Sequence, residues 1–536
     1  MPKLDRFIQH HQTAILLALA VLFLAIRLPQ LTLLPPYVDE GLHISRAFNV
    51  LDEGQPFVYT EGGKYLQIWL ITPMVALGSD PLWNARLVSV LLGLVSAVGC
   101  YFLGKALFDR PSVGLAAALF YGIIPYAFFL DRLALNDSML GTLAIGIALL
   151  SLRLIKRQTL AAGLLLGLML GLTGLTKLNG LILWVIPPLA ILFCGDDSFR
   201  RLVSNDSLVK WGRLIIVAYG LGVLLIIPIF FAPTAHLDGP ASKTWLLDAA
   251  PLGSFAEMVT GNLQRVWAYY TIYLTWPILI MALLGTTLTL VRRHRGGLLL
   301  LSAILIYNAV FIVITVYLQS RYLFAVVPFA LILAGYGFVT LIDGLATLFQ
   351  RTTHYALRTT HYVSLYLLLL ILCSLPALTF NLRLLTNPTQ APFEAYDRWF
   401  FLDGWTSGYG LNELAAYLRE QADQHGSIVV VRNDASGLTR EGLNIKLANM
   451  SDTIDLETID LRAESAHRLT DLLESADGPV YVVLSLPLAP GAVPFNVDFD
   501  NTPYCHSAAT FYKPDQYNYI GVYRCGIADL VDDSHG

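Results

Sequence analysis

The sequence predicts a polytopic α-helical membrane protein that ends in a soluble α/β domain, and three observations predict this fold class. Only 14% of the 536 residues are charged and 55% are hydrophobic, whereas a soluble globular protein carries about 25% charged residues. The mean hydropathy is +0.59, and apolar runs long enough to cross a membrane recur up to residue 380. Beyond that point the charge becomes acidic, with 10 Lys/Arg and 22 Asp/Glu in residues 381–536 against 25 and 17 before them.

We therefore expect a transmembrane module over residues 1–380 and a soluble domain over residues 381–536, which is an ordinary size for one domain. This composition excludes a cytosolic enzyme, a disordered tail protein and a secreted disulfide framework. It also lacks the basic stripe that a nucleic-acid partner requires. The first apolar run follows Lys3 and Arg6 and is not followed by a small-residue cleavage motif, so it reads as a retained signal-anchor helix.

Eleven membrane-spanning helices are expected, each near the ~20 residues that a ~30 Å apolar core requires. They are 14–34, 84–107, 112–130, 138–152, 160–176, 178–194, 214–232, 272–291, 298–318, 323–345 and 363–380. The apolar segment 65–79 contains Pro73 and would reach only ~22 Å as a helix, so we expect it to lie in the membrane interface. With this assignment sixteen basic residues of short loops fall on the same side as the N-terminus, which predicts a cytoplasmic N-terminus and an extracytoplasmic tail in the cell membrane.

The tail alternates helical and strand patterns, which predicts an α/β domain. Helices are expected at 411–424, 437–448 and 464–475, and strands at 427–431, 480–486, 508–512 and 518–524. Two of the five cysteines, Cys505 and Cys525, fall in this exported domain, where a disulfide would persist. Their spacing alone does not decide whether they pair.

Ionisable residues collect at the predicted outer ends of the spans. Charges at membrane depth are costly and usually mark a site or a pathway, so we expect these side chains to converge on one outer cavity. The candidates are Asp39, Glu40, His43, Glu61, Lys64, Arg132, Asp137, Lys177, Arg321 and Tyr322.

Each candidate also has a purely structural interpretation. The Asp39-Glu40 pair suits the first turn of a helix, where the helix dipole favours acids. Arg132 and Asp137 would form a structural ion pair, and Lys177 and Arg321 would extend from helix ends toward water. The functional interpretation rests on the joint pattern of all these residues.

Several motifs in order along the chain resemble those of the C-type glycosyltransferases (GT-C). The acidic pair Asp39-Glu40 after the first span is similar to the acidic motif of the branch containing dolichyl-phosphate-mannose protein mannosyltransferases and bacterial aminoarabinose transferases. The stretch 59–70, with Glu61 and Lys64, resembles that branch's Glu-Lys-Pro-Pro segment, although two glycines separate the acid from the lysine here. The further matches are Ala-Arg-Leu-Val-Ser at 85–89, Arg132-x-Ala-Leu-x-Asp137, Thr176-Lys177-x-x-Gly180, Arg321-Tyr322 with Pro328, and Trp-Thr-Ser-Gly-Tyr-Gly at 405–410.

This resemblance implies a membrane glycosyltransferase of GT-C-like fold. It would move a sugar from a polyprenyl-phosphate donor to an acceptor hydroxyl of a protein, lipid or glycan on the outer face. Asp39 would be the general base of an inverting transfer, with Glu40 orienting it. Lys177, Arg321, Tyr322 and Arg132 would hold the donor phosphate.

The remaining candidates, Glu61, Lys64, Asp137 and His43, would line the cavity or bind the acceptor. A divalent metal is compatible with Asp39, Glu61 and His43, but no spacing here is diagnostic of a metal site. The sequence identifies neither the sugar nor the acceptor. A secondary transporter or lipid flippase is the main alternative, since intramembrane charges also mark ion pathways, and an assembly or sensor protein is a third.

Overall fold

The computed structural model divides the chain into two compact units. The described residues are 2–57, 63–78, 80–195, 205–231, 252–316, 318–353, 359–433, 438–447, 450–461, 467–476, 478–487, 495–499 and 502–526. The first unit comprises Met1–Leu31, Asn49–Leu77 and Asn84–Pro392, and the second comprises Thr32–Phe48, Gly78–Trp83 and Phe393–Gly536. The tail thus forms one unit with the segment that carries the first acidic motif.

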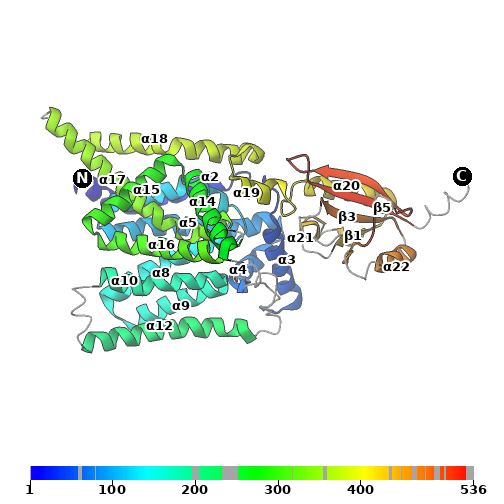
Figure 1. Cartoon of the computed structure of the whole chain (residues 1–536), viewed down its shortest axis with the longest axis horizontal. Helices are drawn as coiled ribbons and strands as arrows, with labels where there is room; N and C mark the ends of the chain where they lie inside the picture. The colour runs from blue at the N-terminus through cyan, green and yellow to red at the C-terminus, as the bar shows by residue number, and fades with distance from the viewer. Residues whose placement is uncertain are drawn as a thin grey trace, which may run out of the picture. The chain divides into compact units, whose positions relative to one another are not determined.

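The first unit is a bundle of helices. In chain order the described helices up to residue 386 are α1 (Pro2–His10), α2 (Gln12–Arg27), α3 (Val38–Glu53, which the unit boundary divides), α4 (Tyr65–Val75), α5 (Pro81–Phe108), α6 (Pro111–Ile123), α7 (Pro125–Leu130), α8 (Asp137–Arg157), α9 (Leu160–Thr176), η2 (Leu178–Val185), α10 (Ile186–Cys194), α12 (Asn205–Phe231), α14 (Leu252–Tyr273), α15 (Trp276–Arg292), α16 (Arg295–Ile314), η3 (Ser320–Val326), α17 (Val327–Thr353) and α18 (Thr359–Thr386). Within the bundle α9 packs between α8 and α12, and α17 packs against α6 and α15 (Figure 1).

Six of the described helices are long and apolar enough to cross a membrane, or up to eight if each of two bent pairs counts as one span. The bent pairs are Leu4–His10 with Gln12–Arg27, at 78°, and Ser254–Tyr273 with Trp276–Arg292, at 114°. The expected total of eleven spans therefore stays a prediction.

Several predicted spans are interrupted for identifiable reasons. The run 112–130 divides into α6 and α7 because Ile124, which precedes Pro125, has extended backbone dihedrals and a residue before proline disfavours helix. The bend before α15 falls at Thr275, whose φ is 66°. The run 178–194 begins as the 3-10 helix η2 before continuing as α10.

The short helix α4 forms where the sequence predicted one. Tyr65, Ile68 and Ile71 on it are fully buried, and Tyr65 packs in a cluster with Leu175 and Ile229. This packing against α9 and α12 anchors α4 to the bundle. Its expected place in the membrane interface stays a prediction.

The tail carries one mixed five-stranded sheet in the order β2-β1-β3-β5-β4. The strands are β1 (Ile428–Asn433), β2 (Ile454–Ile459), β3 (Val480–Leu486), β4 (Cys505–Tyr512) and β5 (Tyr519–Cys525). Strand β1 is parallel to β2 and β3, whereas β5 is antiparallel to β3 and β4. The tail helices are α19 (Ala395–Arg398), η5 (Trp399–Asp403), α20 (Leu411–His425), α21 (Leu438–Leu447) and α22 (His467–Ser475), with the short turn η4 (Pro388–Gln390) before them.

The predicted α/β character of the tail is confirmed, because every predicted helix and strand has a counterpart within a few residues. Strand β2 was missed by the sequence analysis. It lies at the edge of the sheet and carries Asp455, Glu457 and Thr458 among its residues, so it lacks the apolar run that marks a buried strand.

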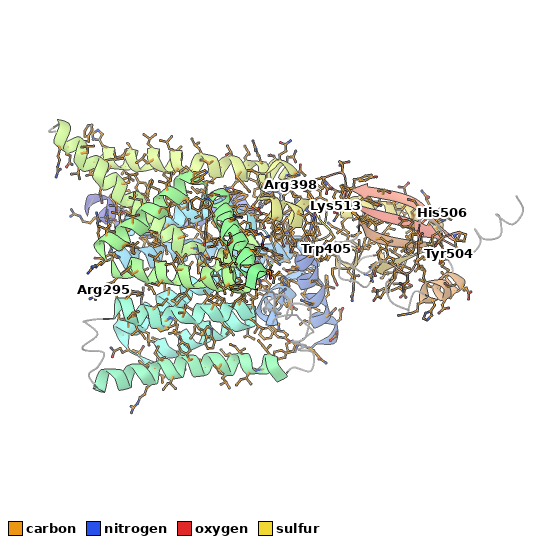
Figure 2. The ribbon with its side chains drawn as sticks, in the orientation of Figure 1. Arg295, Arg398, Trp405, Tyr504, His506 and Lys513 are labelled. Carbon is orange, nitrogen blue, oxygen red and sulfur yellow. A yellow bond between two sulfur atoms is a disulfide. The ribbon has the colours of Figure 1, made fainter. Side chains whose placement is uncertain are left out.

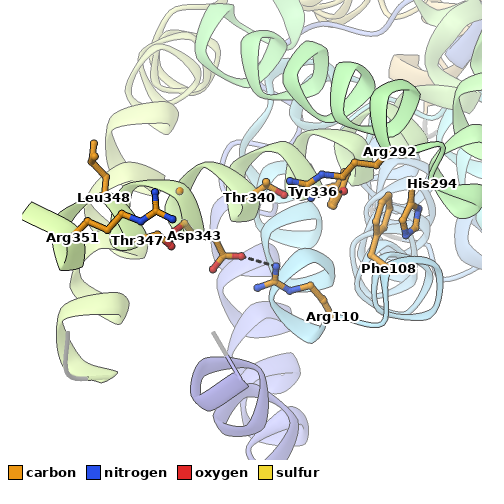
Figure 3. A pocket seen from close by; sticks show the side chains of 11 residues that line it. Phe108, Arg110, Arg292, His294, Tyr336, Thr340, Asp343, Thr347, Leu348 and Arg351 are labelled. Carbon is orange, nitrogen blue, oxygen red and sulfur yellow. Dashed lines mark hydrogen bonds and ion pairs between the residues drawn. The ribbon is translucent and has the colours of Figure 1, made fainter. Parts of the chain in front are cut away.

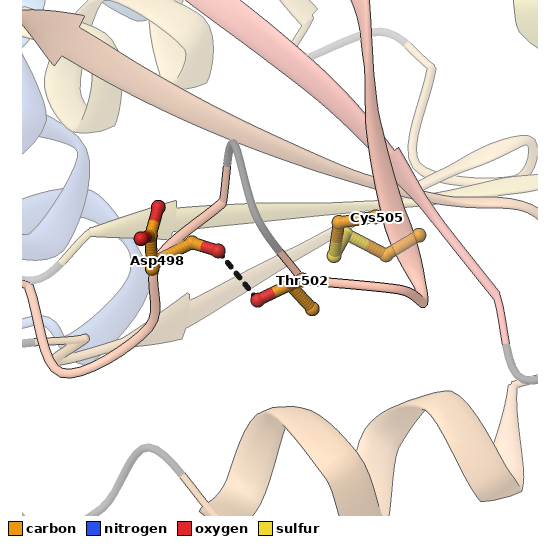
Figure 4. Close-up of a disulfide and its surroundings, with 4 residues drawn as sticks. Asp498, Thr502 and Cys505 are labelled. Carbon is orange, nitrogen blue, oxygen red and sulfur yellow. Dashed lines mark hydrogen bonds between the residues drawn. A yellow bond between two sulfur atoms is a disulfide. The ribbon is translucent and has the colours of Figure 1, made fainter.

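A disulfide joins Cys505 to Cys525 (Figure 4). The two residues are register partners at the ends of β4 and β5, so sheet pairing brings the sulfur atoms together. Next to it, the Thr502 hydroxyl donates to the carbonyl of Asp498 at 2.5 Å. The pairing that the spacing left open is thereby present in the structure.

Candidate active site

Four of the predicted site residues come together in the first unit. The Lys177 ammonium lies 3.8 Å from a carboxylate oxygen of Asp137 and 4.5 Å from the centre of the Tyr322 ring. The guanidinium carbon of Arg321 lies 5.5 Å from the centre of the same ring. These residues, called here the Lys177 cluster, place two cations against one tyrosine ring and a carboxylate beside Lys177.

The backbone leaves α-helical geometry at both cations. Lys177 is extended, with φ −172° and ψ 140°, and it separates α9 from the 3-10 helix η2. Arg321 is the second residue of the 3-10 helix η3, which precedes α17. Since a 3-10 turn within a longer helical run often marks a functional segment, both breaks agree with the site interpretation.

Gly180 permits the turn that follows Lys177. Its amide donates to the Lys177 carbonyl at 2.8 Å, and a Cβ added at residue 180 would lie 2.5 Å from the carbonyl oxygen of Thr173. No real Cβ approaches an oxygen so closely, so only glycine fits this position. The Thr-Lys-x-x-Gly motif therefore has a steric explanation.

Buried polar atoms without hydrogen-bond partners among the described residues occur on the elements around this cluster. They are Asn136 Oδ1, Asn179 Oδ1, Tyr307 Oη and Asn308 Oδ1. Asn136 precedes Asp137 in sequence, and Asp137 is close enough to Tyr307 to interact with it electrostatically. Because unpaired buried polar groups are rare in native proteins and need an explanation, these atoms are candidates to bind the hydroxyl groups of a ligand.

Arg132 has a structural role. Its guanidinium donates to the carbonyls of Pro29 at 2.9 Å and Gln30 at 2.6 Å, and also to that of Arg27. The Arg27 carbonyl lies at the C-terminal end of α2, where no intrahelical donor remains, and the other two follow within three residues. Arg132 therefore caps α2, and its predicted partner Asp137 pairs with Lys177 instead.

A fully buried ion pair between Arg27 and Asp131 was not predicted from the sequence. The Arg27 Nε lies 3.3 Å from an Asp131 oxygen, and both side chains have no exposed surface. Asp131 also accepts from the Tyr121 hydroxyl at 3.1 Å and from that of Ser138 at 2.8 Å. The sequence shows Arg27 at the end of an apolar run and Asp131 about a hundred residues later. Only the folded structure shows that the two side chains pair.

The acidic pair at 39–40 belongs to the second unit, at the start of α3. Glu40 is fully buried, and its carboxylate accepts from the backbone N–H of Tyr37 at 2.9 Å, whereas Asp39 is partly exposed. His43, also buried, lies one turn after Glu40. Since these residues and the Lys177 cluster belong to different units, the predicted common pocket stays a prediction.

The tail holds the segment that precedes α3. The N–H of Val38 donates to the carbonyl of Thr406 at 3.0 Å, Tyr37 and Ser407 form an antiparallel bridge, and the rings of Tyr37 and Phe401 lie 4.8 Å apart. The motif 405–410 therefore forms the backbone contact that positions the acidic pair.

Lys513 on the tail fixes that motif from the other side. Its ammonium donates to the carbonyls of Gly404 at 2.5 Å and Ser407 at 3.0 Å, and Figure 2 labels it together with Trp405. Burial lowers the pKa of Lys513 to about 7, although the nearby Asp515 and Asp403 raise it. The sequence gave no signal for this lysine, because it lies a hundred residues from the loop that it binds.

Of the predicted site residues Lys64 and Glu61, the structure describes only Lys64. Lys64 immediately precedes α4, and Glu61 lies outside the described residues. Within the described ranges no group of three or more His, Cys, Asp or Glu side chains is arranged to hold a metal ion.

The chain is similar to glycosyltransferases in sequence and in fold. Residues 65–231 match the family described as Dolichyl-phosphate-mannose-protein mannosyltransferase, whereas no curated protein sequence matches the chain. The crystal structure of ArnT from Cupriavidus metallidurans bound to undecaprenyl phosphate matches with a TM-score of 0.55 and 15% identity, over 95% of this chain and 98% of that chain. Its apo state matches with a TM-score of 0.53 and 15% identity, over 96% and 98%.

A shorter match is the S. cerevisiae protein O-mannosyltransferase Pmt1-Pmt2 complex bound to the sugar donor, with a TM-score of 0.35 and 19% identity over 44% of this chain and 35% of that chain. The ArnT matches extend over almost the whole chain, so they show that its fold is GT-C-like. The resemblance predicted from the ordered motifs to the mannosyltransferase and aminoarabinose transferase branch is thereby confirmed, and with it the predicted enzyme class of glycosyltransferase is supported.

Proposed function

We propose that this chain transfers a sugar from a polyprenyl-phosphate donor to an acceptor hydroxyl at the outer face of the cell membrane. The observation that carries the proposal is the Lys177 cluster, in which Lys177 and Arg321 converge on Tyr322 beside Asp137. The ArnT structure with this fold is bound to undecaprenyl phosphate, which supports a lipid phosphate as the donor group here.

In an inverting transfer the acceptor oxygen attacks the anomeric carbon of the sugar. The bond from that carbon to the phosphate oxygen breaks, and the polyprenyl phosphate leaves with the electron pair. Charge therefore develops on the phosphate as the bond breaks, and fixed cations in a water-poor site stabilise it strongly. Lys177 and Arg321 are assigned this role.

The Lys177 ammonium suits phosphate binding because it is a compact point charge, and its contact with Asp137 is a long one. The 3.8 Å separation exceeds the ~2.7–2.9 Å of a charge-assisted hydrogen bond, and an ammonium has three N–H donors. Asp137 would hold Lys177 in place between turnovers, and the Tyr322 ring would orient it through its face. The guanidinium of Arg321, whose Nε donates to Gln319 at 2.6 Å, would add a forked contact.

Asp39 is assigned as the general base that takes the proton of the acceptor hydroxyl. Of the two acids it is the more exposed, while Glu40 is buried and accepts from the Tyr37 amide. Glu40 is therefore a positioning residue. His43 and Lys64 are proposed cavity residues, and a protein, a lipid and a glycan all remain candidate acceptors.

The test incubates the purified full-length protein with a labelled polyprenyl-phosphate sugar and candidate acceptors. A glycosylated or hydrolysed product supports the proposal, whereas an intact donor that is moved across a vesicle membrane would show a flippase instead. A parallel reaction with a chelator tests whether a divalent metal takes part.

Two variants connect the reaction to the assigned residues. Asp39→Asn should lower turnover at least ~100-fold, the usual size of a general-base contribution, and Lys177→Met should lower it by a similar factor because a transition-state cation is lost. The matched controls are Asp52→Asn, an exposed acid on the same helix, and Lys105→Met, a lysine that lies 6.0 Å from the ring of Tyr101. Near-normal turnover in Asp39→Asn would remove Asp39 from the base role.

A further inference from the structure

A second polar cavity lies in the first unit, at the ends of α5, α15 and α17. It has a volume of about 640 Å³, and Figure 3 shows its side chains. Three arginines line it, Arg110, Arg292 and Arg351. They come from three of the loops that the positive-inside rule assigns to the cytoplasmic side, so this cavity opens on the face opposite to the proposed reaction.

The cavity carries an excess of positive charge. The carboxylate that lines it is Asp343, which pairs with Arg110 at 2.7 Å, while Asp5 contacts the Nε of Arg110 at 3.4 Å. Arg292 donates to the hydroxyl of Tyr336 at 3.2 Å. Among the described residues neither Arg292 nor Arg351 has a carboxylate partner, so two guanidinium groups stand uncompensated around one space.

Some N–H donors of the lining side chains have no hydrogen-bond partner among the described residues. Arg110 Nη2 is buried and has no hydrogen-bond partner within the described part of the chain. His294 accepts from the Gly297 amide through Nδ1 at 3.2 Å, which leaves Nε2 as the N–H donor of the neutral ring. Burial, together with nearby Arg292, lowers the pKa of His294, which keeps the ring neutral.

The cavity is also preformed. Phe108 stacks on His294 at 4.5 Å and on Tyr336 at 4.4 Å, so its aromatic wall is fixed before any ligand enters. Leu348 on α17, which also lines the cavity, is 59% exposed. Two features of the cavity suit a phosphate group: the arginines without a described carboxylate partner and the buried Arg110 Nη2 donor. The exposed Leu348 suits a ligand whose phosphate carries an acyl chain.

We propose that this cavity binds a phosphate-bearing anion, either the headgroup of an anionic phospholipid of the inner leaflet or a free phosphate. Arginine forks match phosphate oxygens, and basic pockets between transmembrane helices on the cytoplasmic side suit anionic headgroups. This site is distinct from the donor site, and its test does not depend on sugar transfer.

The test measures thermal unfolding of the full-length protein in a neutral detergent at fixed ionic strength. Three probes are titrated separately: a short-chain phosphatidylglycerol, a phosphatidylcholine of the same chain length, and inorganic pyrophosphate. Phosphatidylglycerol should raise the unfolding midpoint saturably, and phosphatidylcholine should not. Saturable stabilisation by pyrophosphate of the same size would identify a free phosphate as the ligand.

Variants locate the binding. Arg292→Gln with Arg351→Gln should weaken the apparent Kd at least about tenfold, the effect expected of two basic residues near a charged headgroup. Arg153→Gln with Arg157→Gln removes the same charge from exposed positions on the same predicted side, and it should bind as the wild type does. Equal weakening in both double variants, or none in either, would overturn the proposal.

Gly344→Leu tests the cavity without changing charge. A Cβ at this lining position meets no atom within 4 Å, so a leucine side chain has room to enter and exclude the ligand while the helix stays intact. It should abolish the saturable stabilisation. If the arginine double variant fails to fold, Gly344→Leu and Arg351→Gln alone decide the question, and unchanged binding in both contradicts the proposal.

Discussion

Arg27 is anchored by more than its ion pair with Asp131. Its guanidinium also donates to the carbonyls of Gly122 at 2.9 Å and Tyr121 at 3.4 Å, and it lies 3.7 Å from the centre of the Phe23 ring. One residue thus ties α2 to the end of α6 and to Asp131 beyond α7. Such a network is costly to disturb, because each unpaired member stays buried.

We expect Arg27→Met to destabilise the protein by about 3–5 kcal/mol, since it leaves the Asp131 carboxylate buried without a counter-charge. The measurement is the unfolding midpoint of the full-length protein in detergent. Adding Asp131→Asn to Arg27→Met removes the orphaned charge and should recover part of the loss. If the double variant is less stable than the single one, the charge is not what the network stabilises.

Lys513 predicts a pH dependence of stability. Its pKa is about 7 in the folded protein, against an ordinary value of 10.5. Between these values the unfolded chain holds a proton that the folded chain has released, so stability should rise with pH across this range. Lys513→Met removes this contribution.

The check compares unfolding midpoints of the wild type and Lys513→Met at several pH values from 6 to 10. As pH rises, the unfolding midpoint of the wild type should increase relative to that of Lys513→Met. Arg468→Met removes an exposed cation of α22, which does not titrate between pH 6 and 10, and its difference from the wild type should stay constant. A constant difference for Lys513→Met would show that its ammonium does not titrate in this range.

At the scale of elements, the two 3-10 segments η2 and η3 determine where the cations of the Lys177 cluster lie. Hydropathy predicted apolar spans at 178–194 and 323–345, but it carries no information on helix pitch. The turn after Lys177 brings Gly180 against the carbonyl of Thr173, a backbone contact that hydropathy does not encode. For this reason sequence patterns identified Lys177 and Arg321 as candidates but not their shared contact with Tyr322.

Gly180→Ala should therefore impair donor use. The added methyl group cannot be accommodated 2.5 Å from the Thr173 oxygen, so the turn must shift and displace Lys177. A displacement of about 1 Å is expected to cost 10- to 100-fold in kcat/KM. Gly220→Ala, where the new Cβ meets no atom within 4 Å, is the control and should leave activity unchanged. Equal kcat/KM in both variants would separate the Gly180 turn from catalysis.

At the scale of the whole molecule, composition was sufficient to predict the membrane class, and the alternation of helical and strand patterns predicted the α/β tail. Apolar runs of about 20 residues must lie in a membrane, and the period of the apolar residues separates helices from strands. Composition did not predict that the segment carrying Asp39 joins the unit of the tail, because the contact of Val38 with Thr406 spans more than three hundred residues. The contacts of Lys513 with Gly404 and Ser407 were not predicted for the same reason, because they join residues more than a hundred positions apart.

Orientation is the remaining whole-molecule prediction, and single cysteines test it. Gln424 on α20 and Arg157 at the end of α8 are both exposed, and the positive-inside rule places them on opposite sides of the membrane. A membrane-impermeant maleimide should therefore label Gln424→Cys in intact cells, while Arg157→Cys should react only after permeabilisation. Cys100, Cys194 and Cys373 are replaced by serine in this background, and Cys505 and Cys525 are kept because they pair in the tail. Labelling of Arg157→Cys in intact cells, alone or together with Gln424→Cys, would contradict the predicted topology, on which transfer at the outer face depends.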